Sequence, residues 1–243
     1  MCSSRASKRM RAAGRNKRGR RSAQRKRAGG GSREGGADVM NIMILTDHES
    51  RLLYDYYEPE RMKDIDLIIS CGDLSAEYLT FFATLCHVPV LYVRGNHDSR
   101  YAEKPPEGCI CIEDDIYVYE GVRILGLGGS MEYIPGASNQ YTEQKMRQRV
   151  RRMGWKLWRH KGFDILVAHA PAYQVNDLED LPHRGFAVFR SLMEKYRPKF
   201  FFHGHVHANY SSSFKRKDRY ADTTVINAYD FYVVEYPLGP ADR

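Results

Sequence analysis

The sequence predicts an α/β domain in which two packed sheets are flanked by helices, spanning residues 40–243. Short apolar runs alternate with helical patterns along this stretch, and hairpin-like strands follow them. The 204 residues after position 39 are rich in Ile, Val, Leu, Tyr and Phe, which is enough apolar surface for a sizeable core. The composition therefore favours one folded domain.

Residues 1–39 have a different composition. They contain no Leu, Ile, Phe, Tyr or Trp, so we expect a disordered tail that cannot offset the entropy of ordering. Thirteen Lys and Arg lie there against two acids, leaving 25 basic and 28 acidic residues, a net charge of −3, for residues 40–243. Such a tail can contact nucleic acid or acidic membranes nonspecifically. A solvated arm, or translated sequence ahead of a true start at Met40, is the alternative.

Each predicted strand is a brief apolar run bounded by polar residues or glycine. In chain order these runs are residues 42–45, 67–70, 88–93, 117–119, 122–127, 163–168, 200–203, 223–227 and 231–235. Glu120-Gly121 separates the fourth run from the fifth, which indicates a hairpin.

Three segments have helical patterns: residues 75–86, 142–160 and 186–196. Ser75 is the expected N-cap of the first, with Glu77 in its first turn. The second is crowded with Lys and Arg, which suits either a solvated helix face or a nucleic-acid face.

The chain has no run of ~20 apolar residues, so no membrane span is predicted. The tail lacks the apolar core of a secretory signal, although its Arg and Ser content leaves a transit peptide open. Five cysteines, an odd number without metal-site spacing, favour reduced thiols and a cytoplasmic location. The sequence does not define an oligomeric state.

Polar residues follow five of the predicted strands at the point where each strand ends. They are Asp47, Gly72-Asp73, Gly95-Asn96-His97-Asp98, His169 and Gly204-His205-Val206-His207. Loops at the carboxyl ends of strands converge on one crevice in α/β folds. We therefore expect carboxylates, an amide and imidazoles to meet there, with Gly72, Gly95 and Gly204 allowing sharp turns.

This set of side chains suits two adjacent divalent metals of intermediate softness, which accept nitrogen and oxygen ligands together. A carboxylate can bridge such a pair, and paired metals clamp the oxygens of a phosphoryl displacement. Each piece alone is common in proteins, but the five in this order, each at a strand end, favour a functional site over ordinary loop residues.

These motifs resemble those of the calcineurin-like metallophosphoesterases over essentially all of residues 40–236. The resemblance implies a four-layer α/β/β/α sandwich and two divalent ions, Mn foremost, with Fe, Zn or Mg as alternatives. It implies that Asp47, Asp73 and His207 hold the first metal. Asp73 would bridge to a second metal, which Asn96, His169 and His205 also hold.

The resemblance also implies catalytic roles. His97 would protonate the leaving oxygen or stabilise the transferring phosphoryl group, and Asp98 would orient His97. The nucleophile would be a metal-bound hydroxide.

One position departs from the family pattern Asp-x-His. This sequence reads Asp47-His48-Glu49, so a carboxylate stands where an imidazole is expected, and His48 should point away. Glu49 is either an oxygen ligand of the first metal or a solvent-facing residue beside a loosely bound metal. Arg94, His183 and Arg184 are either phosphate contacts or ordinary surface residues.

The function that we expect is hydrolysis of phosphomonoesters or phosphodiesters. Residues 98–169 leave no room for a large cap domain, so the site should be open to a phosphate-ester substrate of undefined class. Two alternatives belong to other classes: a noncatalytic binding scaffold that retains the fold, and a nucleic-acid-binding protein that acts through residues 1–39.

Overall fold

The computed structural model describes residues 39–210 and 214–239, which belong to one compact unit. The predicted tail, apart from Val39, lies outside the described residues. Within the described part, none of the helices has both the length and the apolar run needed to cross a bilayer.

The first sheet has the strand order β13-β1-β2-β3-β4. Strands β1 (Val39–Thr46), β2 (Leu67–Ser70), β3 (Val90–Tyr92) and β4 (Ile110–Cys111) are parallel, and β13 (Asp230–Pro237) pairs antiparallel with β1. The carboxyl ends of β1, β2 and β3 therefore lie at one edge.

The second sheet has the order β11-β12-β10-β9-β6-β5. Its four inner strands are parallel: β6 (Val122–Leu127), β9 (Ile165–Ala168), β10 (Phe200–His203) and β12 (Thr223–Asn227). The outer strands, β5 (Asp115–Tyr119) and β11 (Lys217–Tyr220), pair antiparallel. A parallel pair of short strands, β7 (Ser130–Met131) and β8 (Gln140–Tyr141), stands apart.

Alternating side chains build a core on both faces of each sheet. In β1, Ile42 and Ile44 enter the same cluster as Ile165 of β9, whereas Met43 and Leu45 pack with the residues of α1 (Ala76–Leu85). Successive strand residues point to opposite faces, so one strand serves two layers. In β9, Leu166 enters the third cluster with the outer helices.

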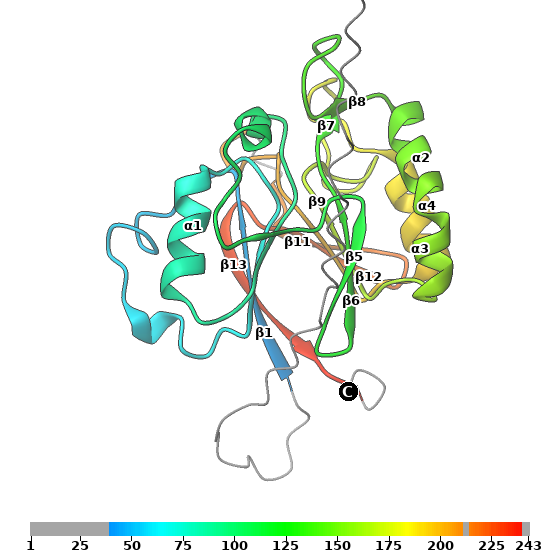
Figure 1. Ribbon diagram of the computed structural model, residues 1–243. Coiled ribbons are helices and arrows are strands. Elements are labelled where there is room, and N and C mark those ends of the chain that lie inside the picture. Colours follow the sequence, from blue (N-terminus) through cyan, green and yellow to red (C-terminus); the bar gives the residue numbers. More distant parts are fainter. Residues whose placement is uncertain (1–38, 211–213, 240–243) are drawn as a thin grey trace, which may run out of the picture. The chain divides into compact units, whose positions relative to one another are not determined.

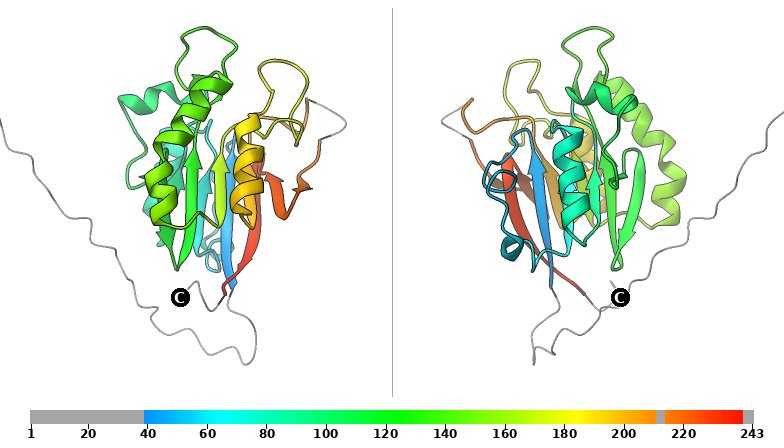
Figure 2. Two further views of the ribbon diagram at one scale, coloured as in Figure 1. Left: turned by 90° about the vertical axis from the view of Figure 1, so that its right-hand side faces the viewer. Right: turned by 60° about the vertical axis from the view of Figure 1, so that its left-hand side comes forward.

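The helices cover the outer faces, giving the predicted four-layer α/β/β/α sandwich. Figures 1 and 2 show α1 on one side of the paired sheets and α2 (Glu143–Arg152), α3 (Gly154–Arg159) and α4 (Ala187–Tyr196) on the other. Ser75 caps α1 as predicted, because its side chain accepts the backbone N–H of Tyr78. Two 3-10 helices, Pro59–Arg61 and Asp98–Ala102, complete the described elements.

The predicted single helix over residues 142–160 is wrong in one respect, since it divides into α2 and α3 at Met153. Gly154 follows the break, and glycine costs a helix roughly 1 kcal/mol relative to alanine. The predictions also missed β4, β7, β8 and β11. Three of these have only two residues, and β11 is polar, so none has an apolar signature.

A buried ion pair ties α2 to the segment beside the predicted site. Arg149 is 8% exposed, donates to Glu113 at 2.9 Å and to the carbonyl of Gly128 at 2.7 Å, and also contacts Asp114. The other oxygen of Glu113 accepts from Arg94 at 2.6 Å. This network fixes Arg94, which immediately precedes the Gly95-Asn96-His97-Asp98 loop.

Replacing Arg149 with leucine should lower the free energy of unfolding by about 3–5 kcal/mol, because the buried carboxylate of Glu113 loses its buried cationic partner. Arg147→Ala, which breaks the surface pair with Glu143 on the same helix, is the matched control and should cost less than about 1 kcal/mol. Chemical denaturation measures both. Equal small losses would show that the buried network does not hold α2 in place.

Candidate metal centre

The two sheets join at their carboxyl edges through hydrogen bonds from the predicted site residues. The backbone N–H of His205, after β10, donates to Asp47 Oδ2, after β1, at 2.8 Å. Nδ1 of His169, after β9, lies 2.9 Å from the carbonyl oxygen of Cys71, after β2. Residues from opposite sheets thus meet in one place, as the strand-end positions predict.

Four donor atoms gather around one point in this junction. Nε2 of His169 lies 2.9 Å from Asn96 Oδ1, 3.1 Å from His205 Nδ1 and 3.2 Å from Asp73 Oδ2. Ligand atoms of Asp73, His169 and His205 all lie within 4.8 Å of one another. Two imidazole nitrogens, an amide oxygen and a carboxylate oxygen form the mixed set that Mn, Fe and Zn accept.

Neighbouring groups orient each of these donors. Cys71 and Pro182 offer carbonyl oxygens to His169 Nδ1 and to His205 Nε2, at 2.9 and 2.8 Å. Those ring nitrogens must be the protonated ones, so the opposite nitrogens face the cluster. The Asn96 amide group donates to Tyr133 Oη at 3.3 Å, which turns Oδ1 inward. Such outer contacts fix the orientation of metal ligands.

The electrostatics of the cluster favour a cation. Burial alone would lower the pKa of His169, but the charge of Asp73 and a hydrogen bond to it raise that pKa to about 9. Burial would likewise raise the pKa of Asp73, yet the charge of His169 lowers it to about 2. The protonated imidazole of His169 therefore supplies the positive charge that the carboxylate requires.

Asp47 and His207 form a second group of donors. Asp47 Oδ2 accepts hydrogen bonds from Thr46 Oγ1 and from the His205 backbone. Oδ1 is buried, lies 3.5 Å from His207 Nε2 and has no hydrogen bond from any residue that the structure describes. Burial would raise the pKa of Asp47, but His207 and the charge of His169 hold it below its usual value. A buried, ionised and unpaired oxygen fits a metal ligand.

Two glycines serve a different purpose from the one predicted. Gly72 does have a positive φ of 100°, but Gly204 and Gly95 are required for close approach. A Cβ atom on Gly204 would lie 2.3 Å from Asp47 Oδ2, and one on Gly95 would lie 2.0 Å from Asp73 Oδ1. The backbone at these two positions is packed directly against the carboxylates.

The tetrapeptide loop places His97 beside Asp73. The backbone N–H of His97 donates to Asp73 Oδ1 at 2.8 Å, and its side chain is 75% exposed with Nε2 4.0 Å from Asp73 Oδ2. Asp98 Oδ2 instead accepts the backbone N–H groups of Asp73 and Gly95, each at 2.8 Å. Between residues 39 and 210, no hydrogen bond joins Asp98 to the His97 ring.

Burial and the charge of Asp73 raise the pKa of Asp98 to about 7. Its hydrogen bonds hold the loops after β2 and β3 together, and the predicted orientation of His97 by Asp98 stays a prediction.

Glu49 is not brought into the cluster. Its Oε1 accepts the backbone N–H of Ser75 at 2.9 Å, at the start of α1. His48 lies 3.3 Å from Asp230 Oδ1, away from the four donors as expected. This contact places the Glu49 carboxylate at the amino end of α1, and its role toward a metal stays a prediction.

Aromatic rings extend from the cluster toward the surface. His183 packs on His205 with ring centroids 5.1 Å apart, and its Nδ1 lies 2.6 Å from Asp180. Tyr210 stacks on His207 at 4.4 Å. Of the proposed phosphate contacts, His183 lies at the site, whereas Arg94 is held by Glu113. Sequence reasoning missed Tyr133 and Tyr210, because a single tyrosine in a loop has no distinguishing pattern.

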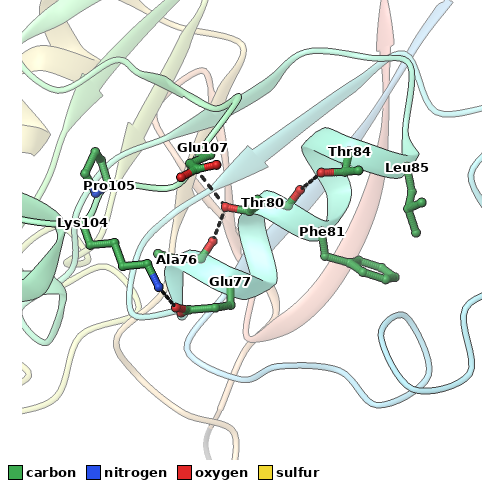
Figure 3. Close-up of a pocket in the computed structure, with 9 residues that line it drawn as sticks. All are labelled: Ala76, Glu77, Thr80, Phe81, Thr84, Leu85, Lys104, Pro105 and Glu107. Atoms are coloured by element: carbon green, nitrogen blue, oxygen red, sulfur yellow. Dashed lines mark hydrogen bonds and ion pairs between the residues drawn. The ribbon is translucent and has the colours of Figure 1, made fainter.

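A pocket of about 550 Å³ lies away from these residues. It lies between α1 and residues 104–107, and Figure 3 draws its lining residues, Phe81, Leu85 and Pro105 among them. Lys104 and Glu77 pair across it at 2.5 Å. It contains none of the predicted site residues.

Comparison with known proteins agrees with this geometry. A curated relative, "Uncharacterized protein MJ1162" of Methanocaldococcus jannaschii, is 26% identical over 202 residues, covering 77% of this chain and 87% of its own. The crystal structure of TT1561 of Thermus thermophilus has a TM-score of 0.56 at 15% identity, covering 79% of this chain and 90% of that one.

Another solved structure has a TM-score of 0.60 at 15% identity and covers 82% of this chain and 95% of its own. These similarities support the fold. The family model for calcineurin-like phosphoesterases matches residues 40–209, which include every candidate metal ligand. The chain belongs to the calcineurin-like phosphoesterase family.

Proposed function

We propose that this protein hydrolyses phosphate esters with two divalent metal ions. The observation that carries the proposal is the set of donors gathered at His169 Nε2, in which each ring is already turned so that its candidate ligand nitrogen faces inward. Asp73, Asn96, His169 and His205 would hold one ion. Asp47 and His207 would hold the other, with Asp73 between the two.

Bound divalent ions supply the chemistry that the side chains lack: they lower the pKa of water to provide a nucleophile, and they stabilise charge on phosphoryl oxygens. Mn²⁺ is the ion that we favour, with Fe, Zn or Mg as alternatives, because the donors mix imidazole and carboxylate. The protein's contribution is to fix the positions of the donors before any ion arrives.

His97 is the group that we assign to the leaving oxygen. Its exposed ring stands beside Asp73, so it can approach an ester bound at the metals and give up a proton as the bond to phosphorus breaks. Asp98 would act indirectly, because it holds the backbone of Asp73 and Gly95 and so helps to position His97.

The competing functions make different use of the same residues. A noncatalytic scaffold would need neither the inward-turned donors nor an exposed His97. A nucleic-acid-binding protein acting through residues 1–39 would bind without hydrolysis and would lose binding when that segment is removed. A panel of phosphomonoesters, phosphodiesters and short nucleic acids, tested with Mn²⁺ added to metal-free protein, separates the three.

Chelation should abolish hydrolysis, and Mn²⁺ should restore it best. Calorimetry should find two ions per chain, and Asp73→Asn should weaken both because it sits between them. Asp55→Asn, which alters a surface carboxylate paired with Arg51, is the control and should leave both sites intact. Full activity in a sample shown to be free of metal would contradict the mechanism.

Metal affinity should also depend on pH. The pKa of metal-free His169 is raised to about 9, so this ring must lose a proton before it can bind an ion. Affinity for the second ion should therefore fall as the pH decreases below about 9, by up to about tenfold per unit. An affinity that is constant between pH 6 and pH 9 would exclude His169 as a ligand.

His97→Ala should leave metal content unchanged and lower turnover by ~10²–10⁴, the usual contribution of a general acid. Esters with good leaving groups should be affected less, because they need less protonation. His160→Ala, on the outer helical layer, is the control. A uniform loss across leaving groups would argue against the acid role.

Glu49 offers a test of the departure from the family pattern. If Glu49 acts through Ser75, Glu49→Ala should keep both metals and reduce the free energy of unfolding by less than about 1 kcal/mol. If it ligates the first metal, both Glu49→Ala and Glu49→Gln should weaken that ion selectively. Metal titration of the two variants decides between these roles.

A further inference from the structure

Two tryptophans on the outer helical layer are exposed in a way that the fold does not require. Trp155 and Trp158 of α3 are 66% and 69% exposed, and their rings stack with centroids 4.8 Å apart at 28°. Tryptophan side chains normally contribute large buried areas to cores and interfaces. Here the inward face of the same segment is filled by Met153 and Leu157, both buried in the core. The indole pair is therefore free to contact a ligand.

Exposed cations flank the two tryptophans along the chain. Arg151 and Arg152 lie four and three positions before Trp155, Arg159 lies four after it, and Lys161 lies three after Trp158. Arg159 shares a face of α3 with Trp155, whereas Arg151 and Arg152 end α2 just before the break at Met153, and Lys161 follows α3. All four are exposed, and none forms an ion pair with any acid in residues 39–210 or 214–239. By contrast Lys145, Arg147 and Lys156, on the same two helices, are each paired with a carboxylate.

The charge of this surface selects an anionic partner. In a symmetric dimer this surface would face its own copy, so the four cations of one protomer would lie against the four of the other and repel them. A membrane-binding helix buries an extended apolar face, yet Trp155 and Trp158 are the only exposed large apolar residues on α2 and α3. A partner with phosphate charges and flat rings fits both the arginines and the indoles.

We propose that the surface formed by Trp155, Trp158, Arg151, Arg152, Arg159 and Lys161 binds single-stranded nucleic acid. Bases stack on the open indole faces, and the cations contact the phosphates between them. Proteins that bind single strands without sequence preference combine these two features. Base stacking is sequence-tolerant, so we expect little discrimination between bases.

This surface is distinct from the metal centre. Helix α3 leads into the amino end of β9, whereas His169 follows its carboxyl end. Figure 1 shows α3 at the opposite end of the helical layer from β7 and β8, beside which Tyr133 contacts Asn96. The proposal consequently stands whether or not the protein hydrolyses phosphate esters.

The chain contains two tryptophans in total, so its intrinsic tryptophan fluorescence reports on this surface alone. We would titrate the full-length protein with single-stranded oligodeoxythymidylate of about ten nucleotides, within the usual site size. Saturable quenching is the expected result. Trp155→Ala should weaken binding by about fivefold or more, with Trp158 remaining as the reporter.

Charge variants provide the second measurement. Arg151→Ala with Arg152→Ala should reduce the slope of log K against log salt by about 1.4, for two lost phosphate contacts. Lys217→Ala removes an exposed lysine from β11, at the other edge of the same sheet, and should change nothing. Any contribution from residues 1–39 is common to all variants. The proposal would be overturned if the oligonucleotide does not quench the fluorescence, or if only phosphatidylserine vesicles change it. An unchanged salt slope in the Arg151 and Arg152 variant would also overturn it.

Discussion

Two hydrogen bonds between the sheets determine the geometry of the candidate metal centre. His205 donates its backbone N–H to Asp47, and His169 donates from its ring to the carbonyl of Cys71. Each bond joins a loop of one sheet to a loop of the other. The same contacts turn the side chains inward, so the packing of the two sheets and the orientation of the candidate ligands have one cause. Gly204 permits this because any side chain there would collide with Asp47.

Burying carboxylates and imidazoles between two apolar layers is costly unless the charges compensate one another. Asp73 and His169 do so, since each moves the other's pKa toward its charged form. Asp47 keeps one buried oxygen without a hydrogen bond among the described residues. A proton on His169 thus balances the charge of Asp73, whereas Asp47 Oδ1 lacks a hydrogen bond. A divalent cation would replace that proton and contact that oxygen.

Much of this arrangement follows from sequence, because apolar runs mark strands and the candidate ligands follow strand ends. The residues that do so, in loops that converge, are Asp47, Asp73, Asn96, His169, His205 and His207. The exceptions have local causes. Glu49 contacts Ser75 through a packing of β1 against α1 that no pattern specifies, and the contacts of Asp98 depend on how two loops approach each other.

Other features were beyond sequence reasoning for similar reasons. The helix over residues 142–160 has continuous helical periodicity, and only Gly154 hints at the break after α2. The carbonyl of Pro182 orients His205, but the position of a backbone carbonyl cannot be predicted from the residue type. Tyr133 is 37 residues from Asn96, so their contact depends on the tertiary fold alone.

The central claim is that these donors hold two divalent ions. Anomalous diffraction from crystals grown with Mn²⁺ tests it directly. We predict one ion bound by Asp73, Asn96, His169 and His205, and a second bound by Asp47 and His207 on the other side of Asp73. If His169 Nε2 keeps its contacts with Asn96 and Asp73 and no ion lies between them, or if Mn²⁺ binds elsewhere, the account is contradicted.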